Sequence, residues 1–193
     1  MDADDTRIES NNVSGASVAG IATFHRTAAV GNFVHDNGDV GLDVQGTGNS
    51  IAGNTVVSNG TGIVLFGLTH VVTDNVVAGN RLTGIEIGPP GTALNVNGNT
   101  VVRNRAAGVH VQSASSGDYA GLVITGNNLY ANGLVFNNNC GVENDHFEVV
   151  RAERNYWGKA TGPGANPADS ACGNVDAVPF AARAFVITND AGR

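Results

Sequence analysis

A seven-residue motif recurs along this chain, and it constrains the fold more than any other feature of the sequence. Three copies occupy residues 53–59, 74–80 and 98–104, and they read Gly-Asn-Thr-Val-Val-Ser-Asn, Asp-Asn-Val-Val-Ala-Gly-Asn and Gly-Asn-Thr-Val-Val-Arg-Asn. The first Asn of each copy belongs to a series with spacings of 21 to 28 residues: Asn11, Asn32, Asn54, Asn75, Asn99, Asn127 and Asn155. Repetition at this scale predicts a solenoid, because one such unit cannot bury its apolar face without its neighbours.

Apolar residues keep fixed positions relative to each of these Asn residues. They lie three residues before it, two residues after it, and at alternate positions beyond a following Gly, as in Gly62-Ile63-Val64-Leu65. Each repeat therefore holds three short alternating segments rich in β-branched residues, which favours strands over helices. When such coils stack, strands pair in parallel about 4.8 Å apart and the inward positions form continuous apolar stripes.

The recurring Asn residues predict a second source of stability. Asn side chains at equivalent turns can pair their amides with the same residue in the coils above and below, as in cross-β ladders. Asn and Gly also tolerate the left-handed backbone that a tight corner requires. We therefore predict a structural ladder formed by Asn32, Asn54, Asn75, Asn99 and Asn127.

This pattern resembles the right-handed parallel β-helix proteins of the pectin-lyase-like superfamily, and the resemblance covers residues 7–160. It implies an all-β fold, a right-handed parallel β-helix solenoid of about seven coils with three short strands per coil. We expect this solenoid to occupy residues 1–160. Residues 161–193 are expected to form a C-terminal capping tail packed on the same domain.

Residues 155–169 depart from the repeat and begin Asn-Tyr-Trp-Gly, with Gly-Pro following. This segment is similar to the closing motif at the C-terminal end of many secreted bacterial β-helix proteins. Trp157 falls in the inward column of Val101 and Leu129, so it is predicted to cover the last coil. A sugar-stacking platform is the alternative role for this ring. The Gly and Pro residues after Trp157 are predicted to prevent a further strand.

The chain has two cysteines, Cys140 and Cys172. An even pair without metal-like spacing predicts a disulfide in an exported protein, and the alternative is two free thiols in a cytoplasmic one. We therefore expect an extracellular, cell-surface or periplasmic location.

Charge and composition argue against several classes of partner. The formal net charge is −7 and Lys159 is the one lysine, which disfavours nucleic acid because phosphates require a basic face. No apolar run in the sequence approaches membrane-spanning length. The five His residues fall at different offsets from the recurring Asn residues, so we predict no metal site and no cofactor.

Ionisable residues recur at one outward strand position, and we take this position as the candidate site. Reading down successive coils, the position between two apolar residues holds Asp43, Val64, Glu86 and His110. These side chains are the catalytic candidates, because paired carboxylates suit an inverting hydrolase and a His beside an Arg can abstract a proton next to a uronate carboxylate.

The surroundings of this row supply the candidate ligand-binding residues. Arg81 and Arg105 lie at the preceding turns, and two polar insertions at 113–121 and 137–145 follow the row. Tyr119 in the first insertion is the expected sugar-stacking residue, so the predicted binding set is Glu86, His110, Arg81, Arg105 and Tyr119.

Three functions remain open on this evidence. The first is a surface module that binds a polysaccharide or a cell-surface glycan. The second is a polysaccharide lyase, epimerase or inverting hydrolase that uses Asp43, Glu86 and His110. The third is a structural stalk or a fragment of a longer surface protein, since a shared fold does not transfer activity.

The two ends of the predicted solenoid differ. Residues 1–6 before Ile8 form a short acidic leader without an amphipathic helix, although solenoids normally need a polar cap at each end. We therefore expect either a missing N-terminal part stacked on the first coil or a weak homodimer through that coil.

Overall fold

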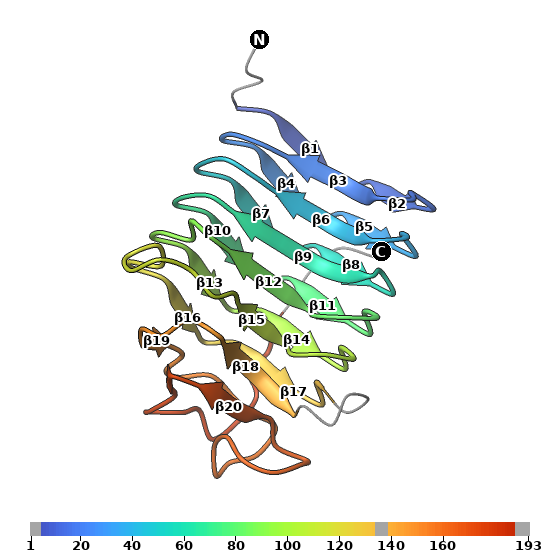
Figure 1. Ribbon diagram of the computed structural model, residues 1–193. Coiled ribbons are helices and arrows are strands. Elements are labelled where there is room, and N and C mark those ends of the chain that lie inside the picture. The colour runs from blue at the N-terminus through green and yellow to red at the C-terminus, as the bar shows by residue number, and fades with distance from the viewer. Residues whose placement is uncertain (1–4, 134–138, 188–193) are drawn as a thin grey trace.

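The computed structural model describes residues 5–133 and 139–187, and over these ranges the chain winds into a parallel β-solenoid. The strands step down the solenoid from the N-terminal to the C-terminal end in three stacked sheets (Figure 1). From β1 to β18 each coil contributes one strand to each sheet in turn, and the described ranges contain no helix. This arrangement confirms the all-β solenoid with three short strands per coil.

The three sheets follow one another around each coil. Sheet A contains β1 (Arg7–Glu9), β4 (Ala28–Val30), β7 (Ser50–Ala52), β10 (Val71–Thr73), β13 (Asn95–Asn97), β16 (Val123–Thr125), β19 (Val150–Arg151) and β21 (Val175–Asp176). Sheet B contains β2 (Asn12–Ser14), β5 (Phe33–His35), β8 (Thr55–Val57), β11 (Val76–Ala78), β14 (Thr100–Val102) and β17 (Asn128–Tyr130). Sheet C contains β3 (Ala19–Thr23), β6 (Val40–Val44), β9 (Thr61–Phe66), β12 (Ile85–Gly88), β15 (Val109–Val111), β18 (Cys140–Asn144) and β20 (Ser170–Gly173).

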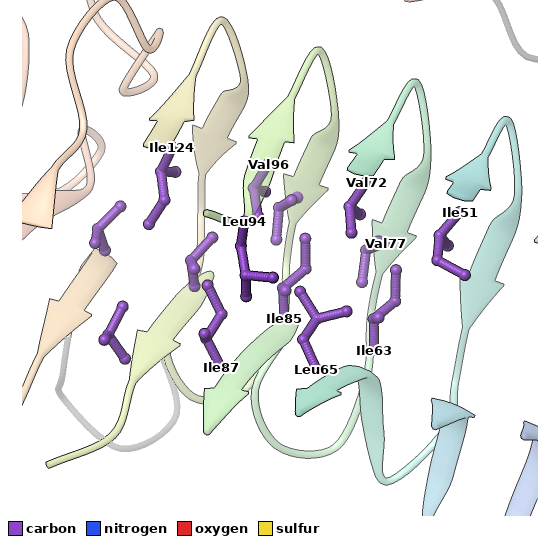
Figure 2. Packing of buried hydrophobic residues seen from close by; sticks show 14 of the residues in the cluster. Ile51, Ile63, Leu65, Val72, Val77, Ile85, Ile87, Leu94, Val96 and Ile124 are labelled. Atoms are coloured by element: carbon purple, nitrogen blue, oxygen red, sulfur yellow. The ribbon is translucent and has the colours of Figure 1, made fainter. Parts of the chain in front are cut away.

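Strand register places the predicted apolar columns inside the solenoid. In sheet A, Ile51 pairs with Val72 and Val72 with Val96, and in Figure 2 these side chains point into the space between the sheets. Ile63 and Ile85 are paired neighbours in sheet C and project into the same space. All five are fully buried, so the core consists of stripes that run along the axis.

The Asn ladder is visible in the hydrogen bonds. The Asn75 side chain accepts from the backbone N–H and the Nδ2 of Asn54, both at 2.9 Å, and its own Nδ2 donates to Asn99 Oδ1 at 2.9 Å. The same Nδ2 also donates to the Ile51 carbonyl at 2.8 Å. This pattern repeats at every step, joining Asn11, Asn32, Asn54, Asn75, Asn99, Asn127 and Asn155.

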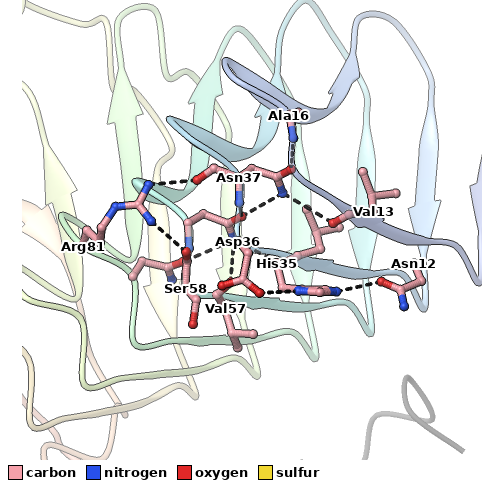
Figure 3. A network of polar contacts seen from close by, with 12 residues as sticks. Asn12, Val13, Ala16, His35, Asp36, Asn37, Val57, Ser58 and Arg81 are labelled. Carbon is pink, nitrogen blue, oxygen red and sulfur yellow. Dashed lines mark hydrogen bonds and ion pairs between the residues drawn. The ribbon is translucent and has the colours of Figure 1, made fainter.

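A second ladder runs along the corner between sheets B and C. It joins Asn37, Asn59, Asn80, Asn104 and Asn132, and Figure 3 shows Asn37, the first of them. The ladder ends at Asp169, whose carboxylate accepts from Asn132 Nδ2 at 2.8 Å and from the Asn132 backbone N–H at 3.2 Å. Burial raises the pKa of Asp169 to about 6, although the hydrogen bonds from Asn132 act in the opposite direction.

A column of glycines lets the coils approach each other beside this second ladder. A Cβ on Gly62 would lie 2.5 Å from Val77 Cγ1 and 2.8 Å from Asn80 Nδ2. A Cβ on Gly84 would meet Val101 and Asn104 at 2.6 Å. Because real Cβ contacts are essentially never shorter than 3.0 Å, this position accepts no side chain without a shift of the coils.

The C-terminal end differs from the sequence prediction. Strands β20 and β21 extend sheets C and A after Trp157, so the expectation that no strand follows was wrong and the sheets continue past residue 160. Tyr156 continues sheet B through a single bridge to Asn128 of β17, and the Gly and Pro residues lie in the segment 158–169 that connects this position to β20 of sheet C.

Two features hold this last coil in place. Trp157 is fully buried and belongs to the core cluster, so its ring covers the end of the sheet B stripe. A disulfide joins Cys140 to Cys172 with the Cα atoms 5.7 Å apart, which lies in the ordinary range.

The ladder predicts a large effect of Asn75→Ala. This substitution removes both hydrogen bonds accepted from Asn54 and the donors to Ile51 and Asn99, leaving several buried groups without partners. Each such group costs about 1–3 kcal/mol, so the free energy of unfolding in urea should fall by several kcal/mol. Asn95→Ala, at an exposed position on β13, is the control and should change it by about 0.5 kcal/mol or less. Equal effects of the two substitutions would contradict the ladder.

The end of the second ladder predicts a pH-dependent contribution to stability. Because the folded pKa of Asp169 lies near 6, above the ordinary 3.8, the folded protein binds this proton more tightly than the unfolded chain. The free energy of unfolding should therefore decrease as the pH rises from about 4 to 6, by roughly 3 kcal/mol in total. Asp169→Asn should remove this decrease, whereas Asp39→Asn at an exposed site should retain it. Urea unfolding between these pH values measures both, and parallel profiles for wild type and Asp169→Asn would refute the assignment.

Candidate functional site

The outer face of sheet C carries the predicted row of polar side chains in register. Asp43 pairs with Val64, Val64 with Glu86, and Glu86 with His110. The structure adds Glu143, which pairs with His110 in the next coil. We call these five residues the sheet C row, and each is partly exposed. Successive members are one strand spacing apart, about 4.8 Å at the backbone.

Glu143 was missed because the long insertion before β18 hides the repeat spacing. A signal for it exists in the sequence, since Gly141-Val142-Glu143 repeats the pattern of Gly84-Ile85-Glu86 and Gly108-Val109-His110. The order Gly, apolar residue, outward residue survives the insertion even though the distance from the preceding Asn does not.

Side chains two positions further along the strands fix the orientation of the row. Gln45 Nε2 donates to Asp43 Oδ1 at 2.7 Å, and Gln112 Nε2 donates to Glu86 Oε1. His110 Nε2 lies 3.0 Å from Asp145 Oδ2. The charged groups are therefore held in defined positions along the face.

An aromatic ring lies beside the row on the same face. Phe66, at the end of β9, is partly exposed, and its ring covers the backbone of Gly88 in the next coil. A Cβ on Gly88 would lie 1.9 Å from this ring, so Gly88 is what allows Phe66 to lie close to the sheet. Phe66 was not predicted, although its alternation with the inward Leu65 places it outside.

The two predicted arginines lie at the corner before sheet C. Arg81 donates to the carbonyl oxygens of Ser58 at 3.0 Å, Asn37 at 2.9 Å and Gly38 at 2.7 Å, and so ties three successive coils together (Figure 3). Arg105 is exposed at the equivalent turn of the next coil. The structure thus gives Arg81 a role in stabilising the corner, and its guanidinium is directed at carbonyl groups there.

Tyr119 is placed differently from its predicted role as a stacking residue. Its side chain is 6% exposed and belongs to the core cluster, and its hydroxyl donates to the Gln112 carbonyl at 2.9 Å. Its ring contacts His146 edge to face, with the centroids 5.1 Å apart. Burial raises the pKa of Tyr119 to about 12. A ring in this position cannot stack on a sugar at the surface, so we remove it from the candidate site and assign it to holding the loop.

Beyond the row, the loop 113–121 contacts the turn between β18 and β19. Ser116 Oγ donates to Glu148 Oε1 at 2.6 Å, and the Gly117 N–H donates to Glu148 Oε2 at 3.4 Å. The hydrogen bond from Ser116, followed by those from His146 and Gly117, lowers the pKa of the partly exposed Glu148. Of the predicted loop 137–145, residues 137 and 138 lie outside the described residues.

Within residues 5–133 and 139–187, no group of three or more His, Cys, Asp and Glu side chains is placed to hold a metal ion. Over the same ranges there is no helix long and apolar enough to cross a membrane.

Comparison with known proteins bears on the fold. A family model described as "Right handed beta helix region" matches residues 1–152. The chain is also similar to the crystal structure of the periplasmic alginate epimerase AlgG, with a TM-score of 0.60 and 23% identity over 78% of this chain. That likeness covers 39% of the epimerase chain, and at this identity it concerns the fold alone. A search of curated proteins finds no match.

The burial of Tyr119 predicts how its substitutions behave. Tyr119→Ala should lower the free energy of unfolding by about 3–5 kcal/mol, as large aromatic truncations in cores do. Tyr119→Phe keeps the ring and loses the hydrogen bond to Gln112, so it should cost about 1 kcal/mol. Phe147→Ala, on the exposed ring of the neighbouring loop, is the control and should leave the melting temperature within about a degree of wild type. An unchanged melting temperature for Tyr119→Ala would show that the ring is not part of the core.

Proposed function

Because the chain belongs to the right-handed β-helix family, we propose that it is an extracytoplasmic module that binds a polysaccharide along the outer face of sheet C. The carbohydrate-active structural neighbour, an alginate epimerase, supports this ligand class. The observation that carries the proposal is the sheet C row itself. Hydrogen-bonding side chains recur there in four of the five consecutive coils from β6 to β18, and Val64 is the exception among these five.

The face has the mixture of groups that a sugar chain requires. Val64 and Phe66 form an apolar patch on β9 against which a sugar ring can pack, and Asp43 and Glu86 flank Val64 in the adjacent coils. The carboxylates accept hydrogen bonds from sugar hydroxyls, while the apolar patch contacts C–H groups. A few placed polar groups beside an apolar surface are typical of small-ligand sites.

The charge of this face selects among polysaccharides. Asp43, Glu86, Glu143 and Asp145 are acidic, and Arg81 is directed toward the corner carbonyls. A polyuronate such as alginate carries one carboxylate per sugar and would be repelled by this face. We therefore propose a neutral or amino-sugar polymer as the ligand, which distinguishes this chain from its epimerase neighbour.

The proposed location rests on the disulfide. The Cys140–Cys172 bond forms and persists in oxidising compartments such as the periplasm and the extracellular space. The epimerase with the similar fold is periplasmic, which agrees with this placement.

One contact favours a catalytic alternative on the same face. The pairing of His110 Nε2 with Asp145 at 3.0 Å is the arrangement by which a carboxylate orients a general base. Proton abstraction from a uronate also needs a cation at the sugar carboxylate. Arg81 is committed to backbone carbonyls, which leaves the exposed Arg105 in the next coil as the candidate for that role. We place binding first because Asp43, Glu86 and Glu143 make this face acidic, which disfavours an anionic uronate. A lyase would be revealed by unsaturated uronate absorbance, and a hydrolase by new reducing ends.

A glycan array followed by calorimetry tests the proposal. We expect binding to neutral or amino-sugar oligomers and not to alginate, with affinity reduced about tenfold or more in the double variant Glu86→Gln/His110→Ala, equivalent to about 1.4 kcal/mol. The matched control is Glu9→Gln/His35→Ala, which makes the same chemical changes on sheets A and B and should leave affinity within about twofold. Melting temperatures of all variants should accompany the titrations. Absence of binding across the array, or equal losses in both double variants, would favour a structural stalk.

A further inference from the structure

A separate hollow lies at the C-terminal end of sheet B, on another side of the solenoid from the sheet C row. It has a volume of about 220 Å³ and is lined by Tyr130, Tyr156, Gly158 and Ala184. Three segments distant in sequence meet there: strand β17, the segment after residue 155, and the C-terminal tail. We call this hollow the tyrosine pocket.

The alternation of residues 155–158 explains how the pocket arises. Asn155 ends the first ladder and Trp157 points inward to cover the core, so Tyr156 between them points outward. Tyr156 is bridged to Asn128 in the preceding coil, and Tyr130 lies two residues further along that strand on the same outer face. The two tyrosine rings meet edge to face with centroids 6.3 Å apart.

Gly158 forms the floor of the pocket because it has no side chain. A Cβ at this position would lie 2.9 Å from Tyr130 Cβ and 3.0 Å from the Pro167 carbonyl oxygen. Gly158 also has a φ of +90°, which side-chain-bearing residues rarely adopt. The Tyr156 hydroxyl donates to the Gly158 carbonyl at 2.8 Å, which fixes this ring relative to the floor.

The tail closes one side of the pocket through contacts that do not involve the tyrosine rings. Phe185 exchanges two hydrogen bonds with the Asn128 side chain, at 2.8 and 3.0 Å. The Ala181 N–H donates to the Asn155 carbonyl at 2.9 Å. Ala184 lies between these two attachment points and faces the rings with only a methyl group.

We propose that the tyrosine pocket binds a single pyranose ring, independently of the sheet C row. Both tyrosines are partly exposed, and their rings meet at 72°, so a sugar ring can stack its C–H face on one and contact the other with its edge. The hydroxyl of Tyr156, which donates to Gly158, retains acceptor capacity for a sugar hydroxyl. A volume near 220 Å³ falls below the roughly 300–1,000 Å³ of pockets that enclose drug-sized ligands, so it suits one ring of a chain.

The test uses the fact that the chain has three tyrosines. We would label the tyrosine rings with carbon-13 and titrate the full chain with methyl β-glucopyranoside, methyl α-mannopyranoside or methyl β-galactopyranoside. Binding should shift the ring signals of Tyr130 and Tyr156, whereas Tyr119, whose ring is buried in the core, should stay unchanged as an internal reference. Tyr→Phe variants assign the three signals.

Matched variants separate binding from stability. Ala184→Leu should fill the pocket and abolish the shifts without lowering the melting temperature, while Ala182→Leu, exposed on the same tail, should preserve them. Glu86→Gln/His110→Ala should also preserve them, so loss of the sheet C function and loss of this one are distinguishable. The proposal would be overturned if none of the three sugars shifted the ring signals of Tyr130 and Tyr156. Equal shifts at all three tyrosines, or shifts caused by cyclohexanol and by no sugar, would overturn it as well.

Discussion

The hydrogen bond from one Asn amide to the Asn of the next coil is the interaction on which the rest of this structure depends. Each ladder side chain uses its oxygen for the coil before it and its nitrogen for the coil after it, and it also satisfies a backbone carbonyl at a corner. From Asn32 to Asn155 the side chains of the first ladder are fully buried, and an unpaired amide there would cost about 1–3 kcal/mol. The ladder therefore fixes the register between coils, and the register in turn aligns the apolar stripes inside and the polar rows outside.

The direction of these bonds makes the two ends of the solenoid different. In both ladders the side-chain donors point toward the C-terminus. The last Asn of a ladder therefore needs a partner that accepts its hydrogen bonds and has no donor of its own to satisfy. Asp169 meets that need in the second ladder because a carboxylate accepts without donating. Its pKa near 6 is the consequence of placing an acceptor-only group at a dry end. At the same end of the solenoid, the Trp157 ring covers the apolar stripe of sheet B.

The fold and the candidate site differ in how far the sequence could predict them. Positions such as Val77 and Asn75 were predictable because their role depends on spacing, and spacing is what a repeat displays. Glu143 and Asp169 were missed because insertions separate them from the repeat, and Asp169 is an acid at a ladder position that Asn occupies in the preceding coils. The burial of Tyr119 depends on how one loop folds over its neighbour, and no periodicity in the sequence records that contact.

The direction of the Asn–Asn hydrogen bonds also bears on the association expected at the first coil. Asn11 donates from its backbone N–H and its Nδ2 to Asn32, so this ladder presents its acceptor end toward the N-terminus. A homodimer that joined two first coils head to head would bring two acceptor ends together, and neither could supply the other with a donor. A coil added in the same direction would donate to Asn11 as Asn11 donates to Asn32. The ladder can therefore be extended at this end only by a coil of the same sense, and a head-to-head contact between two first coils would not continue it.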